Sequence, residues 1–148
     1  MPYIETDDKI KIFYQSFGKG RPIIFVHEFA GDYRSWDPQI NYFSRFYKCI
    51  TFSARGYPPS DVPDSEQFYS QERAWKDIRD LMDCLNIDKA HIVGLSMGGF
   101  ATLHFGLNLP KRSSSLTIAG CGYGAKSSKN KDRKTDFTEE SKKNANQI

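Results

Sequence analysis

The sequence predicts an α/β fold with a mostly parallel sheet and flanking helices. From Pro22 onward, short apolar runs rich in β-branched residues alternate with helical patterns, which is typical of parallel strands joined by crossover helices. Several of these runs are continuously apolar, as strands buried on both faces are. The chain has 148 residues, of which 39% are hydrophobic, so it suits one domain. A domain of this size buries about two-thirds of the surface of its unfolded chain.

Local patterns place the individual elements. Alternating polar and apolar residues around Asp7-Asp8 predict a β-hairpin. Ser35 is expected to cap a helix over 36–46. The expected elements are a hairpin over 3–6 and 9–17, strands over 22–27, 49–53, 90–95 and 115–119, and two further helices over 70–85 and 100–109. The first of these two helices carries one apolar stripe at helical spacing, which we expect to pack in the core.

Charge and cysteine content limit the class of protein. The net charge is +3, and the excess of basic residues lies in residues 126–148, a polar segment without aromatic stacking pairs. We therefore expect a solvated tail and neither a nucleic-acid nor a membrane partner. Cys49, Cys84 and Cys121 form neither a disulfide framework nor a zinc pattern. The N-terminus lacks the features of a signal peptide, so the expected compartment is the cytoplasm.

The strongest functional signal is G-x-S-x-G, formed by Gly94, Ser96 and Gly98 between a predicted strand and a predicted helix. Ser96 must lie on a strained turn to expose its hydroxyl, and the two glycines remove Cβ atoms that would collide there. The following helix directs its N-terminal amides toward an oxyanion, so the Met97 amide is a candidate oxyanion donor.

At this motif the chain resembles the α/β-hydrolase superfamily, in its serine esterase, lactonase and haloperoxidase-like branch. The resemblance covers residues 1 to about 125 and implies the N-terminal part of that core, without the fold's C-terminal strands; the tail after it is similar to the start of a cap. Residues 27–32 resemble the family's oxyanion loop, which implies that the Phe29 amide is the second oxyanion donor. Glu28 stands where the family often has glycine.

A second loop carries the same resemblance. Residues 53–60 are similar to the family's Asp-x-Arg-Gly-x-Gly-x-Ser loop, with Ser53 in place of Asp and Pro58 in place of Gly. We interpret Arg55 as a structural hydrogen-bonding residue. In the family, dehalogenases and epoxide hydrolases have an aspartate at the position of Ser96 in the G-x-S-x-G turn, so the serine disfavours both. The resemblance therefore implies acyl transfer to water through an acyl-serine.

The general base and acid of that reaction are not identifiable in this sequence. His104 lies eight residues after Ser96 on the same helix, His91 opens a strand at its far end, and His27 is expected to orient backbone. The family order places an acid and then a histidine after the serine. We expect both beyond Ile148, and expect the chain as printed to be nearly inactive.

Three other motifs are weighed and set aside. His27-Glu28 could open a zinc H-E-x-x-H, but Gly31 stands where the second histidine is needed. Residues 120–125 fit a loose G-x-G-x-x-A, but no helix pattern follows. Cys121 has no identifiable base. We therefore expect no metal and no cofactor.

Two hypotheses of different classes remain. The first is a serine hydrolase that cleaves a carboxylic ester, a lactone or a similar acyl compound, with Ser96 as nucleophile. The second is a non-catalytic interaction protein, or a fragment without a function of its own. Its motive is the missing acid and base, and its means would be the expected strand over 115–119, whose exposed apolar edge would pair with a second copy or a partner.

Overall fold

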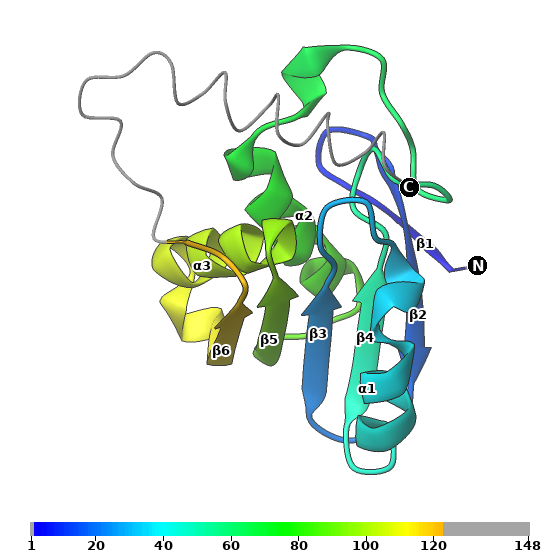
Figure 1. Cartoon of the computed structure of the whole chain (residues 1–148), viewed down its shortest axis with the longest axis vertical. Coiled ribbons are helices and arrows are strands. Elements are labelled where there is room, and N and C mark those ends of the chain that lie inside the picture. Colours follow the sequence, from blue (N-terminus) through cyan, green and yellow to red (C-terminus); the bar gives the residue numbers. More distant parts are fainter. Residues whose placement is uncertain (1, 123–148) are drawn as a thin grey trace.

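The computed structural model describes residues 2–122. It contains one six-stranded sheet with the strand order β1-β2-β4-β3-β5-β6 (Figure 1). The strands are β1 (Tyr3–Glu5), β2 (Lys11–Phe17), β3 (Pro22–Val26), β4 (Lys48–Phe52), β5 (Ala90–Leu95) and β6 (Ser113–Ala119), and the helices are α1 (Asp37–Phe43), α2 (Gln71–Cys84) and α3 (Met97–Asn108). Short 3₁₀ turns cover Tyr33–Trp36, Glu66–Phe68 and Pro110–Arg112.

The sheet is mostly parallel, which confirms the predicted fold class. β3 pairs in parallel with β4 on one side and with β5 on the other, and β5 pairs in parallel with β6. Among the strands of residues 2–122, the antiparallel pairs are β1–β2, which forms the N-terminal hairpin, and β2–β4. Parallel strands run their carboxyl ends to the same edge, so the loops after β3, β4 and β5 meet there.

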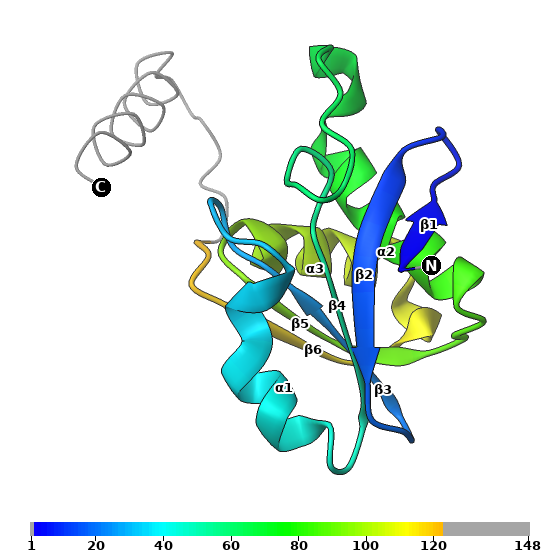
Figure 2. The ribbon, with the colours of Figure 1, turned by 90° about the vertical axis from the view of Figure 1, so that its right-hand side faces the viewer.

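The two faces of the sheet are covered unequally (Figure 2). α2 and α3 lie on one face, over a core that includes the fully buried side chains of Ile24, Ile50 and Ile92. On the opposite face α1 packs its buried Ile40 over a smaller cluster. Beside α1 a cavity of about 340 Å³ remains, which extends to Thr117 on β6.

The helix starts differ from the sequence expectation in two places. Ser35 does not cap α1; it closes a capping box with Asp32, which caps the preceding 3₁₀ turn, and α1 itself begins at Asp37. α3 begins at Met97, three residues before the expected start, because tertiary packing overrides the low helix propensity of two consecutive glycines.

Within residues 2–122, no helix has the length and apolar composition that crossing a membrane requires. The expected basic tail over 126–148, including the segment that is similar to the start of a cap, lies outside the described residues.

Candidate active site

Ser96 lies in a strained turn between β5 and α3. Its backbone has φ 51° and ψ −113°, a left-handed conformation that L-residues with side chains rarely adopt. The turn is fixed by its backbone, because the Ser96 amide donates to the carbonyl of Ala119 at 2.8 Å and the Phe100 amide donates to the Ser96 carbonyl at 3.1 Å. Ser96 therefore sits at the carboxyl edge of the sheet with its position set by two neighbouring elements.

The glycines on both sides of Ser96 allow close backbone contact. A Cβ atom at Gly94 would lie 2.2 Å from the carbonyl oxygen of Gly98. A Cβ atom at Gly98 would lie 2.2 Å from the Val26 carbonyl oxygen. Real Cβ atoms do not approach other atoms so closely, so both positions require glycine. The second contact also shows that the start of α3 packs directly against the end of β3, where the loop that carries Phe29 begins.

His27 holds this loop through its side chain. The buried ring accepts a hydrogen bond from the Ala54 amide at Nε2 (2.9 Å), and its Nδ1 lies 2.7 Å from the Glu28 carbonyl oxygen. The Ala54 amide can only donate, so Nε2 carries no proton and Nδ1 donates to the carbonyl. Burial lowers the pKa of His27, which favours this neutral form. His27 therefore orients backbone on two loops, as the sequence predicts.

The side chain of Glu28 turns toward the neighbouring 3₁₀ turn. Its Oε1 accepts a hydrogen bond from the Ser35 hydroxyl at 3.1 Å, while its Oε2 is buried without a hydrogen-bond partner among the described residues. A Cβ atom at Gly31 would lie 2.6 Å from the same Oε1, which shows how tightly the loop folds around the carboxylate.

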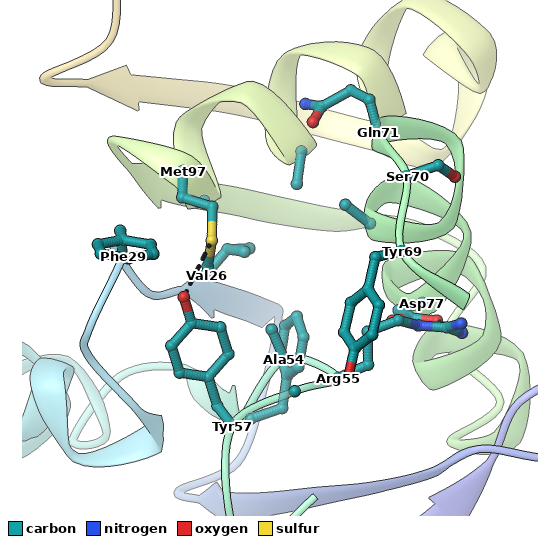
Figure 3. A pocket seen from close by; sticks show the side chains of 15 residues that line it. Val26, Phe29, Ala54, Arg55, Tyr57, Tyr69, Ser70, Gln71, Asp77 and Met97 are labelled. Carbon is teal, nitrogen blue, oxygen red and sulfur yellow. Dashed lines mark hydrogen bonds and ion pairs between the residues drawn. The ribbon is translucent and has the colours of Figure 1, made fainter. Parts of the chain in front are cut away.

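A cavity of about 430 Å³ opens beside Met97, the residue that follows Ser96 in the turn (Figure 3). Phe29, which is 64% exposed, and Met97 both line it. The rest of its wall comes from β3, β4, the loop after β4, and helices α2 and α3: Val26, Phe52, Ala54, Arg55, Gly56, Tyr57, Tyr69, Ser70, Gln71, Ala74, Asp77, Gly98 and Ala101. The two residues expected to supply oxyanion amides thus belong to one cavity whose wall is mainly apolar.

Arg55 is a buried structural residue with every donor engaged. It forms paired hydrogen bonds with Asp77 (2.8 and 2.6 Å) and with Asp8 (2.8 and 2.9 Å), and it donates to the Phe68 carbonyl at 2.8 Å. These contacts use all five N–H groups of the guanidinium. The structure therefore assigns Arg55 to the fold, as the sequence predicts, and leaves it no donor for a ligand.

The charges in this cluster shift one another's protonation. The guanidinium of Arg55 holds the pKa of Asp8 well below its usual range. Burial raises the pKa of Asp77 to about 6, although its hydrogen bonds with Arg55 act in the opposite direction. Burial also disfavours the charged form of Arg55, but the bonds with Asp77 and Asp8 outweigh it and raise the pKa of Arg55.

Sequence reasoning missed both carboxylate partners of Arg55 because they lie far from it along the chain. One signal was present for Asp77, which interrupts the apolar stripe of the 70–85 helix. A carboxylate on a helix face that packs in the core requires a cationic partner. Tyr57 was also missed as a cavity residue.

None of the three histidines of the chain lies where it could deprotonate Ser96. His104 is eight residues along α3, which corresponds to about 12 Å of helix axis. His91 is the second residue of β5, about 16 Å of strand away from Ser96, and its Nδ1 pairs with the Ser115 hydroxyl at 2.7 Å. His27 has both ring nitrogens engaged by backbone.

Within residues 2–122, no group of three or more His, Cys, Asp or Glu side chains is placed to hold an ion. Glu28, the second residue of the His27-Glu28 pair, contacts Ser35.

Comparisons with known proteins agree with this architecture. The family described as alpha/beta hydrolase fold matches residues 21–136. The chain is 34% identical over 97 residues to 3-oxoadipate enol-lactonase 1 of Acinetobacter baylyi, covering 66% of this chain and 35% of the lactonase. It is 31% identical over 105 residues to epoxide hydrolase 1 of Caenorhabditis elegans, covering 70% of this chain and 26% of that enzyme.

A solved structure of an N-acyl homoserine lactone degrading enzyme superimposes with a TM-score of 0.79 at 32% identity. The superposition covers 93% of this chain and 52% of that enzyme. The chain thus spans about half or less of the length of these relatives, which is consistent with the partial fold that the sequence predicts. The family match covers most of the chain, and it agrees with the sheet order, the strained serine turn and the packed glycines: this chain belongs to the α/β-hydrolase fold family.

Proposed function

We propose that Ser96 is the nucleophile of a hydrolase that cleaves a carboxylic ester, a lactone or a similar acyl compound. The observation that carries the proposal is the Ser96 turn itself, with its positive φ beside a mainly apolar cavity of about 430 Å³. Backbone strain of this kind persists only where the surrounding structure enforces it, and it recurs at reactive side chains. A serine nucleophile favours acyl transfer, because its ester intermediate can be hydrolysed by water.

The amides of Met97 and Phe29 are the proposed oxyanion donors. Met97 is the first residue of α3, so its amide has no acceptor within the helix and adds to the positive end of the helix dipole. Phe29 follows Glu28, whose carbonyl accepts a hydrogen bond from the His27 ring. The same ring accepts from the Ala54 amide in the loop after β4, which fixes this segment. Support for the pair comes from the direct packing of Gly98 against the Val26 carbonyl, which brings the two segments together.

The general base and acid are expected outside the described residues. A serine hydroxyl needs a base to become a strong nucleophile, and all three histidines of the chain are occupied or distant. We therefore propose that residues 1–148 alone hydrolyse esters only weakly, through binding and oxyanion effects.

The experiment compares Ser96→Ala with Ser16→Ala in a protein that contains residues 1–148 together with the proposed base and acid. The substrate is p-nitrophenyl butanoate. Ser16 is exposed on β2, away from the cavity, and serves as the matched serine control. We expect Ser96→Ala to lower kcat/KM by about 10³-fold or more and Ser16→Ala to leave it unchanged. Esterase activity that survives in Ser96→Ala would show that the serine mechanism is wrong.

A second candidate function is self-association through β6. Within the described residues β6 pairs only with β5, and its Leu116 and Ile118 are 36% and 38% exposed. An unpaired apolar strand at a sheet edge pairs readily with a second copy. Sedimentation velocity should then show a dimer that Ile118→Lys dissociates and Leu107→Lys, an exposed position on α3, does not. A monomer at high protein concentration would exclude this function.

A further inference from the structure

The cavity beside Ser96 has few polar groups, and most of them already have partners. Arg55 has no free donor, and Asp77 is paired with it through both oxygens. The Tyr69 hydroxyl donates to the Pro63 carbonyl at 2.7 Å. The Ser70 hydroxyl caps α2 by accepting from the Arg73 amide at 3.0 Å. A ligand gains little from Arg55, Asp77 or Tyr69, because it would first have to break a bond to a strong partner. The Ser70 hydroxyl still has a proton to donate, but Ser70 is exposed to solvent.

Tyr57 differs from these residues in the quality of its partner. Its hydroxyl points across the cavity to the sulfur of Met97 at 3.5 Å (Figure 3). A thioether is a weak acceptor, so a ligand oxygen that replaces it forms the stronger bond. Gln71 also lines the cavity, but it is exposed to solvent.

The ring of Tyr57 is held in place independently of this weak bond. It packs edge-on against the His27 ring, with 4.9 Å between ring centroids and an interplanar angle of 75°. His27 is in turn fixed by the backbone of two loops. Burial raises the pKa of Tyr57, so its hydroxyl carries its proton at neutral pH and donates. Tyr57 is therefore a preorganised donor in a largely apolar wall.

We propose that Tyr57 is a specificity-determining residue that donates a hydrogen bond to an uncharged oxygen on the acyl group of the substrate, displacing the Met97 sulfur. The favoured substrate class is an acyl compound whose chain carries a keto, ether or amide oxygen. A carboxylate on the chain is disfavoured, because the only cation among the described cavity residues, Arg55, has no free donor. That the ligand is a substrate rests on the proposed function at Ser96.

The test uses p-nitrophenyl esters of hexanoic acid and of 4- and 5-oxohexanoic acid, with each rate divided by the rate of uncatalysed alkaline hydrolysis. The protein that carries these residues should prefer the better oxo ester in kcat/KM by about 3- to 10-fold, as one neutral hydrogen bond gives. Tyr57→Phe keeps the ring and should bring this ratio to about 1. Tyr69→Phe is the matched control and should keep the ratio, because its hydroxyl already has a carbonyl partner. A preference that persists in Tyr57→Phe, or none in the unaltered protein, overturns the proposal.

A binding measurement separates this inference from the function at Ser96. The affinities of Ser96→Ala for the same esters should show the same oxo preference, and Ser96→Ala/Tyr57→Phe should lose it. Turnover by Ser96→Ala would refute the serine mechanism. The role of Tyr57 would then be decided by whether Tyr57→Phe still removes the preference for the oxo ester. Equal affinities for plain and oxo esters in Ser96→Ala would refute the role of Tyr57 whatever the mechanism.

Discussion

The Ser96 turn (residues 94–98) and the Arg55 cluster (Asp8, Arg55 and Asp77) each fix one wall of the same cavity, by different physical means. The turn is held by backbone packed against backbone, with no space for a Cβ atom at Gly98. The cluster is held by charge, through paired hydrogen bonds from one buried guanidinium to two carboxylates.

This difference determines how each region responds to change. Packing of backbone against backbone cannot be restored by a second substitution, because no side chain forms the contact. It also does not depend on pH. An ion cluster tolerates the joint replacement of its members but not the loss of one, and its strength depends on protonation. The proposed nucleophile, Ser96, therefore belongs to the region that is held by steric packing and not by charge.

The largest expected effect is that of Gly98→Ala. The added Cβ would lie 2.2 Å from the Val26 carbonyl oxygen and 2.6 Å from the His27 carbonyl oxygen, so β3 and α3 must separate. We expect the free energy of unfolding to fall by more than about 4 kcal/mol, measured by urea denaturation.

The control for Gly98→Ala is Gly106→Ala, which creates an equally short contact of a different kind. Its Cβ would lie 2.2 Å from a terminal methyl carbon of Leu116, on a half-exposed side chain that can rotate away. Alanine also has the higher helix propensity, so we expect a change of less than about 1 kcal/mol. Equal losses at the two glycines would contradict the distinction between backbone and side-chain contacts.

The next largest effect is expected for Arg55→Met. The substitution leaves the buried carboxylates of Asp77 and Asp8 without their cation, which should cost about 3 kcal/mol of unfolding free energy. The double variant Arg55→Met/Asp77→Leu should recover part of this loss, because it removes one uncompensated charge. Arg34→Met breaks an exposed pair with Asp32 and should leave the unfolding midpoint unchanged. A double variant less stable than Arg55→Met would argue against charge as the cause.

The Ser96 turn was predictable from the sequence because its information is local. Gly94, Ser96 and Gly98 lie within five residues, and a turn so sharp permits few other residue types. The same locality explains why the predictions of the hairpin and of the helix over 70–85 are confirmed. The apolar stripe of this helix and its Ser70 cap lie within a few turns of one another.

The Arg55 cluster and the orientation of Tyr57 were not predictable in this way. Asp8 lies 47 residues from Arg55 in the sequence and Asp77 lies 22 residues from it, and no periodicity links them. The three residues contact one another because the hairpin turn, the loop after β4 and helix α2 lie side by side. That arrangement is set by the order of the strands in the sheet. Local propensity also misplaced the start of α3, where the packing of Gly98 against the end of β3 decides the boundary.

The smallest effect on the free energy of unfolding is expected for Asp8→Asn. Its dependence on pH distinguishes the Arg55 cluster, which is held by charge, from the Ser96 turn, which is held by packing. Arg55 holds the pKa of Asp8 below its usual value of 3.8, so the folded state favours the carboxylate. The resulting stabilisation is present at pH values above 3.8 and is lost progressively as the pH falls from there toward the much lower pKa of the folded state. Burial gives Asp77 the opposite sign, because a pKa raised to about 6 makes protonation favour the folded state. The difference in unfolding free energy between the unaltered protein and Asp8→Asn reports Asp8 together with its effect on Asp77, whose pKa the Asp8 carboxylate raises. We expect a gap of about 1–2 kcal/mol at pH 7 that closes below pH 4, and a gap that persists in acid would mean that Asp8 acts through packing and not through charge.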